Sequence, residues 1–157
     1  MDNLNSKILL LDSSFNIDLL KNNKIIYDKI ISFDFDSHYI LFNNKISHEI
    51  SDNHLNKYEL EQIQKAAYSL SKWYEQKEIS SFVKYDGIDL GNLTYMEFMD
   101  YIVGFLKKFY ELIKITQEYQ QSEFFASPQL YSMIKLLTNN VVHKLQYRSA
   151  KTSELVK

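Results

Sequence analysis

A short stretch of the chain concentrates acidic, hydroxyl and imidazole side chains. Residues 30–42 read IISFDFDSHYILF, with apolar and aromatic residues on both sides of the polar group. Two carboxylates spaced this way could act as a nucleophile and a general acid–base, and a carboxylate near a histidine could bind a metal ion. The same side chains could instead cap a helix that follows a buried strand. The elements that position them decide between these interpretations.

Two continuous apolar runs precede polar residues and predict buried strands. Residues 7–12 (KILLLD) and 29–35 have the composition of strands that are covered on both faces, as in a parallel sheet. Ligands of such sheets bind beyond the carboxyl ends of the strands. If the two strands are neighbours, one crevice receives the polar residues that end them, which are Asp12, Ser13, Ser14, Asp34, Asp36, Ser37 and His38.

The remaining pattern alternates strands with helices. Apolar residues at helical spacing predict a helix over residues 58–78, and a second, longer helix over 95–119. Capping boxes begin both helices, Asn56 with Glu59 and Thr94 with Glu97. Shorter elements are predicted as helical segments over 17–21, 38–44 and from Ser127-Pro128 to 138, and as strands over 46–50, 123–127 and 141–145.

This order of elements predicts an α/β fold. We expect a Rossmann-like parallel sheet with right-handed crossovers and an enlarged helical insertion over about residues 52–119. At 157 residues the chain has the size of one domain, which we expect over residues 1–145, followed by a polar C-terminal tail over 146–157.

Composition and charge exclude several classes of protein. The net charge is −2 and Arg148 is the single arginine, so nucleic acid is not an expected partner. The absence of cysteine removes disulfides and thiolate chemistry and is typical of the reducing cytosol, so we expect a cytoplasmic protein. Charged residues interrupt the apolar stretch over residues 95–115, so no transmembrane segment is expected.

Known catalytic motifs fit the chain poorly. The DFDS segment resembles the first motif of haloacid-dehalogenase-type phosphatases, with Asp34 as nucleophile and Asp36 as acid–base, but the later acidic pair that would hold magnesium is absent. The histidines match no tight ligand spacing, so no metal is expected. Glycine-rich phosphate loops and a GxSxG nucleophile elbow are also absent, so no cofactor is expected.

A second candidate site is the loop YDGIDLGNLT over residues 85–94. Turn formation and helix capping explain its residues, whereas the free amides at the start of the next helix could instead receive an anionic or hydroxyl-rich ligand. The binding candidates of this loop are Tyr85, Gly87, Gly91 and Asn92.

Taken in order, several motifs resemble one family of enzymes. ISFDFDSH, HEISDNHL, LSKWY and the loop YDGIDLGNL, followed by a long apolar helix, resemble the N-terminal regions of cell-surface carbohydrate glycosyltransferases. These GT-B-like enzymes have two Rossmann-like domains and include relatives of CDP-glycerol glycerophosphotransferases. The resemblance covers about residues 7–145, and the loop over 85–91 is its most distinctive part.

The resemblance implies a role in surface-polysaccharide biosynthesis. In that family the C-terminal domain holds most of the activated donor, and the N-terminal domain binds the acceptor. This chain matches the N-terminal domain, so we expect it to bind a glycan or sugar acceptor and to be incomplete as a catalyst alone. A partner chain with a second Rossmann domain is one expected complement. The alternatives are a non-enzymatic interaction domain, or a phosphatase that uses Asp34 and Asp36.

Overall fold

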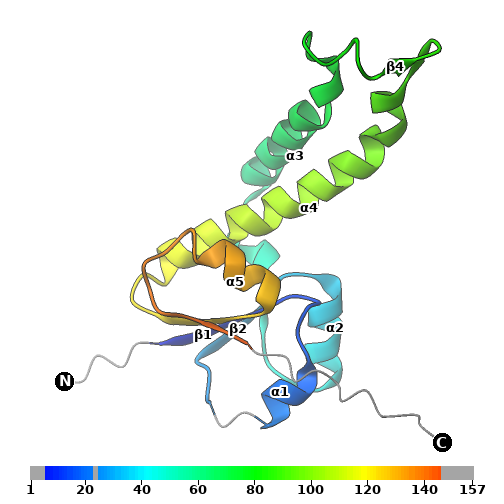
Figure 1. Ribbon diagram of the computed structural model, residues 1–157. Coiled ribbons are helices and arrows are strands. Elements are labelled where there is room, and N and C mark those ends of the chain that lie inside the picture. Colours follow the sequence, from blue (N-terminus) through cyan, green and yellow to red (C-terminus); the bar gives the residue numbers. More distant parts are fainter. Residues whose placement is uncertain (1–5, 23–24, 146–157) are drawn as a thin grey trace, which may run out of the picture. The chain divides into compact units, whose positions relative to one another are not determined.

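The computed structural model describes residues 6–22 and 25–145 (Figure 1). Within these ranges the strands are β1 Lys7–Leu11, β2 Lys29–Ser32, β3 Glu49–Ile50, β4 Lys84–Tyr85, β5 Ile88–Asp89, β6 Glu123–Ala126 and β7 Val142–Lys144. The α-helices are α1 Ile17–Asn22, α2 Phe35–Asn43, α3 Lys57–Ser71, α4 Leu90–Glu118 and α5 Pro128–Ile134, and 3₁₀ turns form at η1 Ser51–His54 and η2 Trp73–Glu75.

The chain separates into two compact units, which are described one at a time. The sheet unit contains the chain up to Asp52 and from Ile115 onward, and the helical unit contains Asn53–Lys114. The expectation of one domain over residues 1–145 stays a prediction, and the expected polar tail over 146–157 lies outside the described residues.

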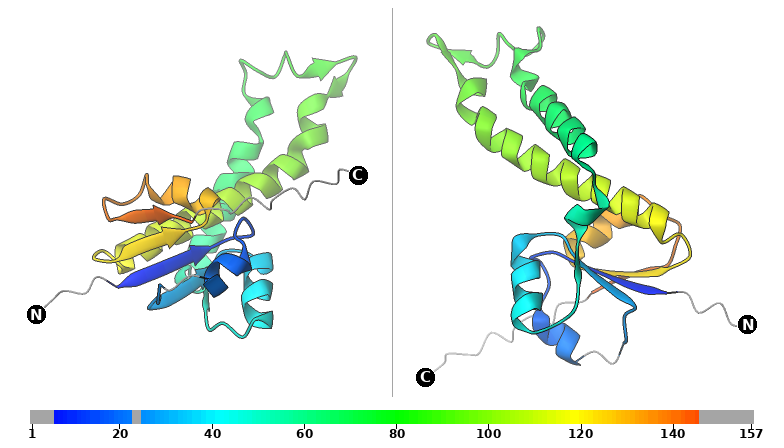
Figure 2. Two further views of the ribbon diagram at one scale, coloured as in Figure 1. Left: turned by 60° about the horizontal axis from the view of Figure 1, so that its bottom comes forward. Right: turned by 180° about the vertical axis from the view of Figure 1, so that it is seen from behind.

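The sheet unit is built on five parallel strands in the order β3-β2-β1-β6-β7. The predicted α/β, Rossmann-like fold with a helical insertion is therefore confirmed. β1 is central because it pairs with β2 on one side and with β6 on the other. Since parallel crossovers are right-handed, α1 and α2 lie on one face of the sheet and α5 lies on the other (Figures 1 and 2).

The apolar core forms on both faces of this sheet. Leu9, Leu11 and Phe125 pack with Phe15 and with Leu41 of α2. Side chains alternate between faces along a strand, so Ile8 and Leu10 serve the opposite face, where they are also fully buried. Burial of each large aliphatic side chain contributes roughly 1.5–3 kcal/mol, which explains why this run can only be an inner strand.

Several strand and helix ends differ from the predictions. β2 ends at Ser32 rather than at residue 35, because Asp34 already caps α2. The predicted α3 limit at residue 78 is wrong, since α3 ends at Ser71 and a 3₁₀ turn follows. The paired part of the strand predicted over 46–50 is Glu49–Ile50, and α5 ends at Ile134 rather than at 138.

The helical unit consists of α3, η2, a short hairpin and the greater part of α4. The capping box of Asn56 and Glu59 at α3 is confirmed. Strands β4 and β5 form an antiparallel hairpin, whose turn places Asp86 and Gly87 at positive φ values of 47° and 78°. The loop predicted over 85–94 is therefore a hairpin followed directly by a helix.

The start of α4 corrects a second prediction. α4 begins at Leu90, so Thr94 lies inside the helix and does not cap it. The Asp89 carboxylate accepts hydrogen bonds from the amides of Gly91 (3.0 Å) and Asn92 (3.4 Å), which would otherwise lack partners at the helix start. The Thr94 hydroxyl instead donates to the Gly91 carbonyl. No helix in the described ranges is long and apolar enough to cross a membrane.

Candidate functional site

Asp12 is the buried centre of a polar cluster at the carboxyl end of β1. Its side chain is fully buried, and its Oδ1 accepts hydrogen bonds from the Ser127 hydroxyl (2.7 Å), from the Ser14 amide (3.0 Å) and from the Ser14 hydroxyl. The Asp12 amide donates to the Ser127 hydroxyl oxygen over 3.3 Å. Because Ser127 follows β6, this cluster joins the ends of two neighbouring strands.

Asp34 extends the cluster to the end of β2. Its Oδ1 accepts from the Ser37 amide (2.9 Å) and its Oδ2 accepts from the Ser13 amide (2.8 Å). The Ser37 hydroxyl oxygen accepts in turn from the Asp34 amide, which completes a capping box at α2. Ser13 and Asp34 were predicted to share one edge of the sheet, and the hydrogen bond between them places them together.

The other two residues of the opening motif take no part in the hydrogen bonds of this cluster within the described ranges. Asp36 is exposed in the first turn of α2. His38 Nδ1 lies 2.8 Å from Nε2 of His48, and His48 Nδ1 donates to the Ile46 carbonyl over 2.8 Å. His38 thus contacts the segment before β3 and not the Asp12 cluster.

One oxygen of the Asp12 carboxylate is distinctive. Oδ2 is buried, and within the described ranges it has no hydrogen-bond partner. An unsatisfied buried acceptor costs roughly 1–3 kcal/mol, so native proteins rarely leave one without a purpose. The cluster therefore keeps an acceptor at the strand ends while Ser14 and Ser127 hold the other oxygen in place.

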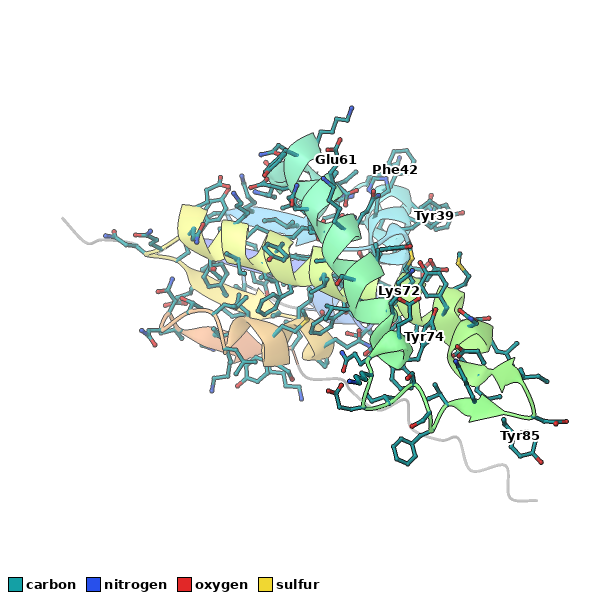
Figure 3. The ribbon with its side chains drawn as sticks, turned by 90° about the horizontal axis from the view of Figure 1, so that it is seen from above. Tyr39, Phe42, Glu61, Lys72, Tyr74 and Tyr85 are labelled. Carbon is teal, nitrogen blue, oxygen red and sulfur yellow. The ribbon has the colours of Figure 1, made fainter. Side chains whose placement is uncertain are left out.

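Sequence reasoning missed the aromatic side chains at this edge. Phe35, the first residue of α2, is 74% exposed, and Tyr39 is 56% exposed with its ring stacked on that of Phe35 at 6.0 Å. Figure 3 shows Tyr39 and Phe42 projecting outward from α2. The sequence offered a signal for Phe35. It lies between two aspartates at the start of a helix, and such a position faces solvent more often than the core. Ser127 was predicted to end the strand over 123–127 and to start a helix, but it was not named as a site residue, although it follows β6 and bonds to Asp12.

The phosphatase and metal interpretations both depend on how the acidic side chains are arranged. Each oxygen of Asp34 accepts a backbone amide hydrogen bond, so the carboxylate caps α2 and holds the Ser13 backbone. Across residues 6–22 and 25–145 no group of three or more His, Asp or Glu side chains is arranged to hold a metal ion.

Another polar cavity, of about 260 Å³, opens beside β2 and β3 in the sheet unit, where Lys29, His48 and Glu49 are among its lining residues. Lys29 Nζ donates to the Tyr119 hydroxyl (2.5 Å) and pairs with Glu49 (3.0 Å). The hydrogen bond to Tyr119 raises the pKa of Lys29, and burial raises the pKa of the Tyr119 hydroxyl. Both groups therefore keep their protons at neutral pH, which suits a structural link better than proton transfer.

The loop candidates lie in the helical unit and have structural partners. A Cβ added to Gly91 would lie 2.1 Å from Cγ of Tyr74, so glycine is required there. Asn92 Oδ1 accepts a hydrogen bond from the Tyr74 hydroxyl over 2.8 Å. Gly87 forms the hairpin turn, and Tyr85 projects from the hairpin, 74% exposed (Figure 3). Turn formation and packing thus account for Gly87, Gly91 and Asn92.

Comparison with protein-family models, with curated proteins and with solved structures finds no match to this chain.

Proposed function

We propose that this chain is the acceptor-side, Rossmann-like domain of an enzyme related to surface-glycan glycosyltransferases, and that it binds a hydroxyl-rich acceptor. The site lies at the carboxyl ends of β1, β2 and β6. The observation that carries the proposal is the buried Asp12 cluster, which links these three strand ends and thereby positions the exposed residues beside them.

The exposed residues at this edge have the chemistry that a sugar needs. Ser13 and Asp36 offer an exposed hydroxyl and an exposed carboxylate, which can exchange hydrogen bonds with ligand hydroxyls. Phe35 offers an exposed ring on which the apolar face of a pyranose can rest. A parallel sheet also binds its ligands at this end, so position and chemistry agree.

Transfer of a sugar or polyol phosphate requires an activated donor as well. The described residues contain no glycine-rich phosphate loop, and no lysine or arginine belongs to the Asp12 cluster that could bind a diphosphate. We therefore assign donor binding to a second Rossmann-like domain, supplied by the same polypeptide or by a partner chain.

The test is ligand-observed and protein-observed NMR with methyl glycosides of galactose, glucose and N-acetylglucosamine, and with glycerol 3-phosphate. Binding should shift the amide signals of Ser13, Ser14 and Phe35 and should weaken at least severalfold in Phe35→Ala and Asp36→Asn. Phe42→Ala is the matched control, because Phe42 is also exposed on α2 but lies at its far end.

Two results would count against the proposal. One is a complete absence of binding by all four compounds in a chain whose amide spectrum is well dispersed. The other is binding that moves signals elsewhere and is equally sensitive to Phe42→Ala and Phe35→Ala.

A further inference from the structure

The helical unit contains a surface pocket that is separate from the proposed acceptor site. Its volume is about 500 Å³, within the range of small-molecule sites, and its walls are Trp73, Thr94, Glu97, Phe98 and Tyr101. Four of these five side chains lie on successive turns of α4, and Trp73 comes from η2. The walls thus combine three aromatic rings, one carboxylate and two hydroxyls, those of Thr94 and Tyr101.

The aromatic rings leave their faces available to a ligand. Within the described ranges, no ring of this trio stacks on another, and the only ring contact of Trp73 is with Tyr74, edge to face at 6.2 Å. Tyr74 is itself fixed, because it is buried against Gly91 and donates to Asn92. Trp73 therefore contacts a side chain that is itself buried and hydrogen-bonded, which favours a preformed pocket wall.

The charge of the pocket is negative and uncompensated. Within the described part of the chain, Glu97 has no hydrogen bond or ion pair, and it is the only charged side chain in the lining. The nearest lysine in sequence to Trp73 is Lys72, which is already occupied over the Tyr68 ring (4.7 Å) and with Glu75 (3.2 Å). An aromatic pocket of this composition complements a cation, since ring faces and a carboxylate both attract positive charge.

We propose that this pocket binds an organic cation with a substituted ammonium group, of the choline type. The ammonium rests against the faces of Trp73, Phe98 and Tyr101, and the Glu97 carboxylate supplies the counter-charge. Thr94 is exposed at the first turns of α4, and its hydroxyl oxygen can accept a hydrogen bond from a hydroxyl carried by the same ligand. A metal ion is a poor alternative, because one carboxylate and two hydroxyls are too few oxygen ligands.

Intrinsic fluorescence tests the proposal directly, because Trp73 is the single tryptophan of the chain. Choline and tetramethylammonium should change the emission of Trp73 saturably. The neutral isostere 3,3-dimethylbutan-1-ol, which replaces the nitrogen of choline by carbon, should bind at least about fivefold more weakly. Light scattering on the same samples establishes the oligomeric state.

Two exposed lining residues provide variants that leave the core intact. Glu97→Gln and Tyr101→Ala should each weaken choline binding by about fivefold or more. The matched controls are Asp100→Asn, which removes an exposed carboxylate from the same helix, and Tyr85→Ala, which removes an exposed ring from the hairpin. Both controls should bind choline as the unmodified chain does.

Several outcomes would overturn the proposal. Equal binding of choline and its neutral isostere would show an unspecific apolar pocket. A response to methyl glycosides without any response to choline would make it a carbohydrate site. A stable dimer that buries Trp73 and gives no choline response would assign this surface to a second copy of the chain.

Discussion

The hydroxyl of Ser127 donates a 2.7 Å hydrogen bond to Oδ1 of Asp12, which joins the ends of β6 and β1 across 115 positions of sequence. Neither residue is exposed to solvent. Because a buried polar group is costly unless it is hydrogen-bonded, the partners of the Asp12 carboxylate offset the cost of its burial.

The first prediction concerns this pair. Ser127→Ala removes one acceptor and one donor from around Asp12 and leaves its carboxylate with fewer partners. We expect the free energy of unfolding to fall by about 1–3 kcal/mol, measured by urea denaturation. Ser132→Ala, at an exposed serine of α5, should change it by less than about 0.5 kcal/mol. Equal effects of the two changes would show that the buried cluster does not stabilise the fold.

The second prediction compares two glycines of α4. In Gly91→Ala the new Cβ collides with the Tyr74 ring, so the chain should lose about 1–3 kcal/mol of stability. In Gly104→Ala the new Cβ meets nothing within 4 Å, so the improved helix propensity should raise stability by about 0.5–1 kcal/mol. Urea denaturation of both variants should give shifts of opposite sign. Shifts of the same sign would contradict the packing of Tyr74 on this helix.

The third prediction concerns acid sensitivity of the helical unit. The Lys114 amine, and then the Asn56 amide, lower the pKa of Glu59 below its ordinary value of 4.5. A lowered folded-state pKa gives stability that is complete above the ordinary value and is lost as the pH falls through the folded-state value. Glu59→Gln should therefore flatten the decline of the melting temperature between about pH 5 and pH 3. Glu61→Gln is the control at an exposed position of the same helix and should retain the decline.

The fourth prediction concerns the tautomers of the histidine pair. His48 Nδ1 donates to a carbonyl, so in the neutral ring its Nε2 must accept, and His38 must then carry its proton on Nδ1. At about pH 8.5, where imidazoles are generally neutral, nitrogen-detected correlation spectra should show the Nδ1–H form for both rings. His48→Ala should return His38 to the Nε2–H form that predominates in free imidazole side chains. An Nε2–H signal from His48 in the unmodified chain would exclude this hydrogen-bond chain.

Local patterns in the sequence were sufficient for much of the fold. The apolar run over 7–12 predicted an inner strand, and Asn56 with Glu59 predicted the start of α3, because both signals act within a few residues. Thr94 with Glu97 failed for a physical reason. Gly91 was read as a loop residue, whereas Asp89 caps the helix earlier and the Tyr74 ring fills the space that a side chain at position 91 would need.

The candidate site was predictable only in part. The sharing of one edge by Asp12 and Asp34 followed from the rule for parallel strands, and the hydrogen bond from Ser13 to Asp34 shows it. The engagement of His38 with His48, and of Ser127 with Asp12, depends on side-chain directions that no local pattern contains. The pocket around Trp73 was missed for the same reason, since one of its walls comes from a different element.

The pairing of β1 with β6 also has a consequence for how fast the chain can fold. Closing a long loop carries an entropic cost, and non-local parallel pairing is a slow step in folding. The intervening chain includes the helical unit, whose internal contacts all fall within residues 53–114, so that they close shorter loops and can form before the β1–β6 pairing. Early formation of that unit would shorten the loop that remains to be closed. The rate-limiting event should then be the pairing of β6 with β1. Mutations in these two strands should slow folding, whereas mutations in the β4–β5 hairpin should mainly speed unfolding.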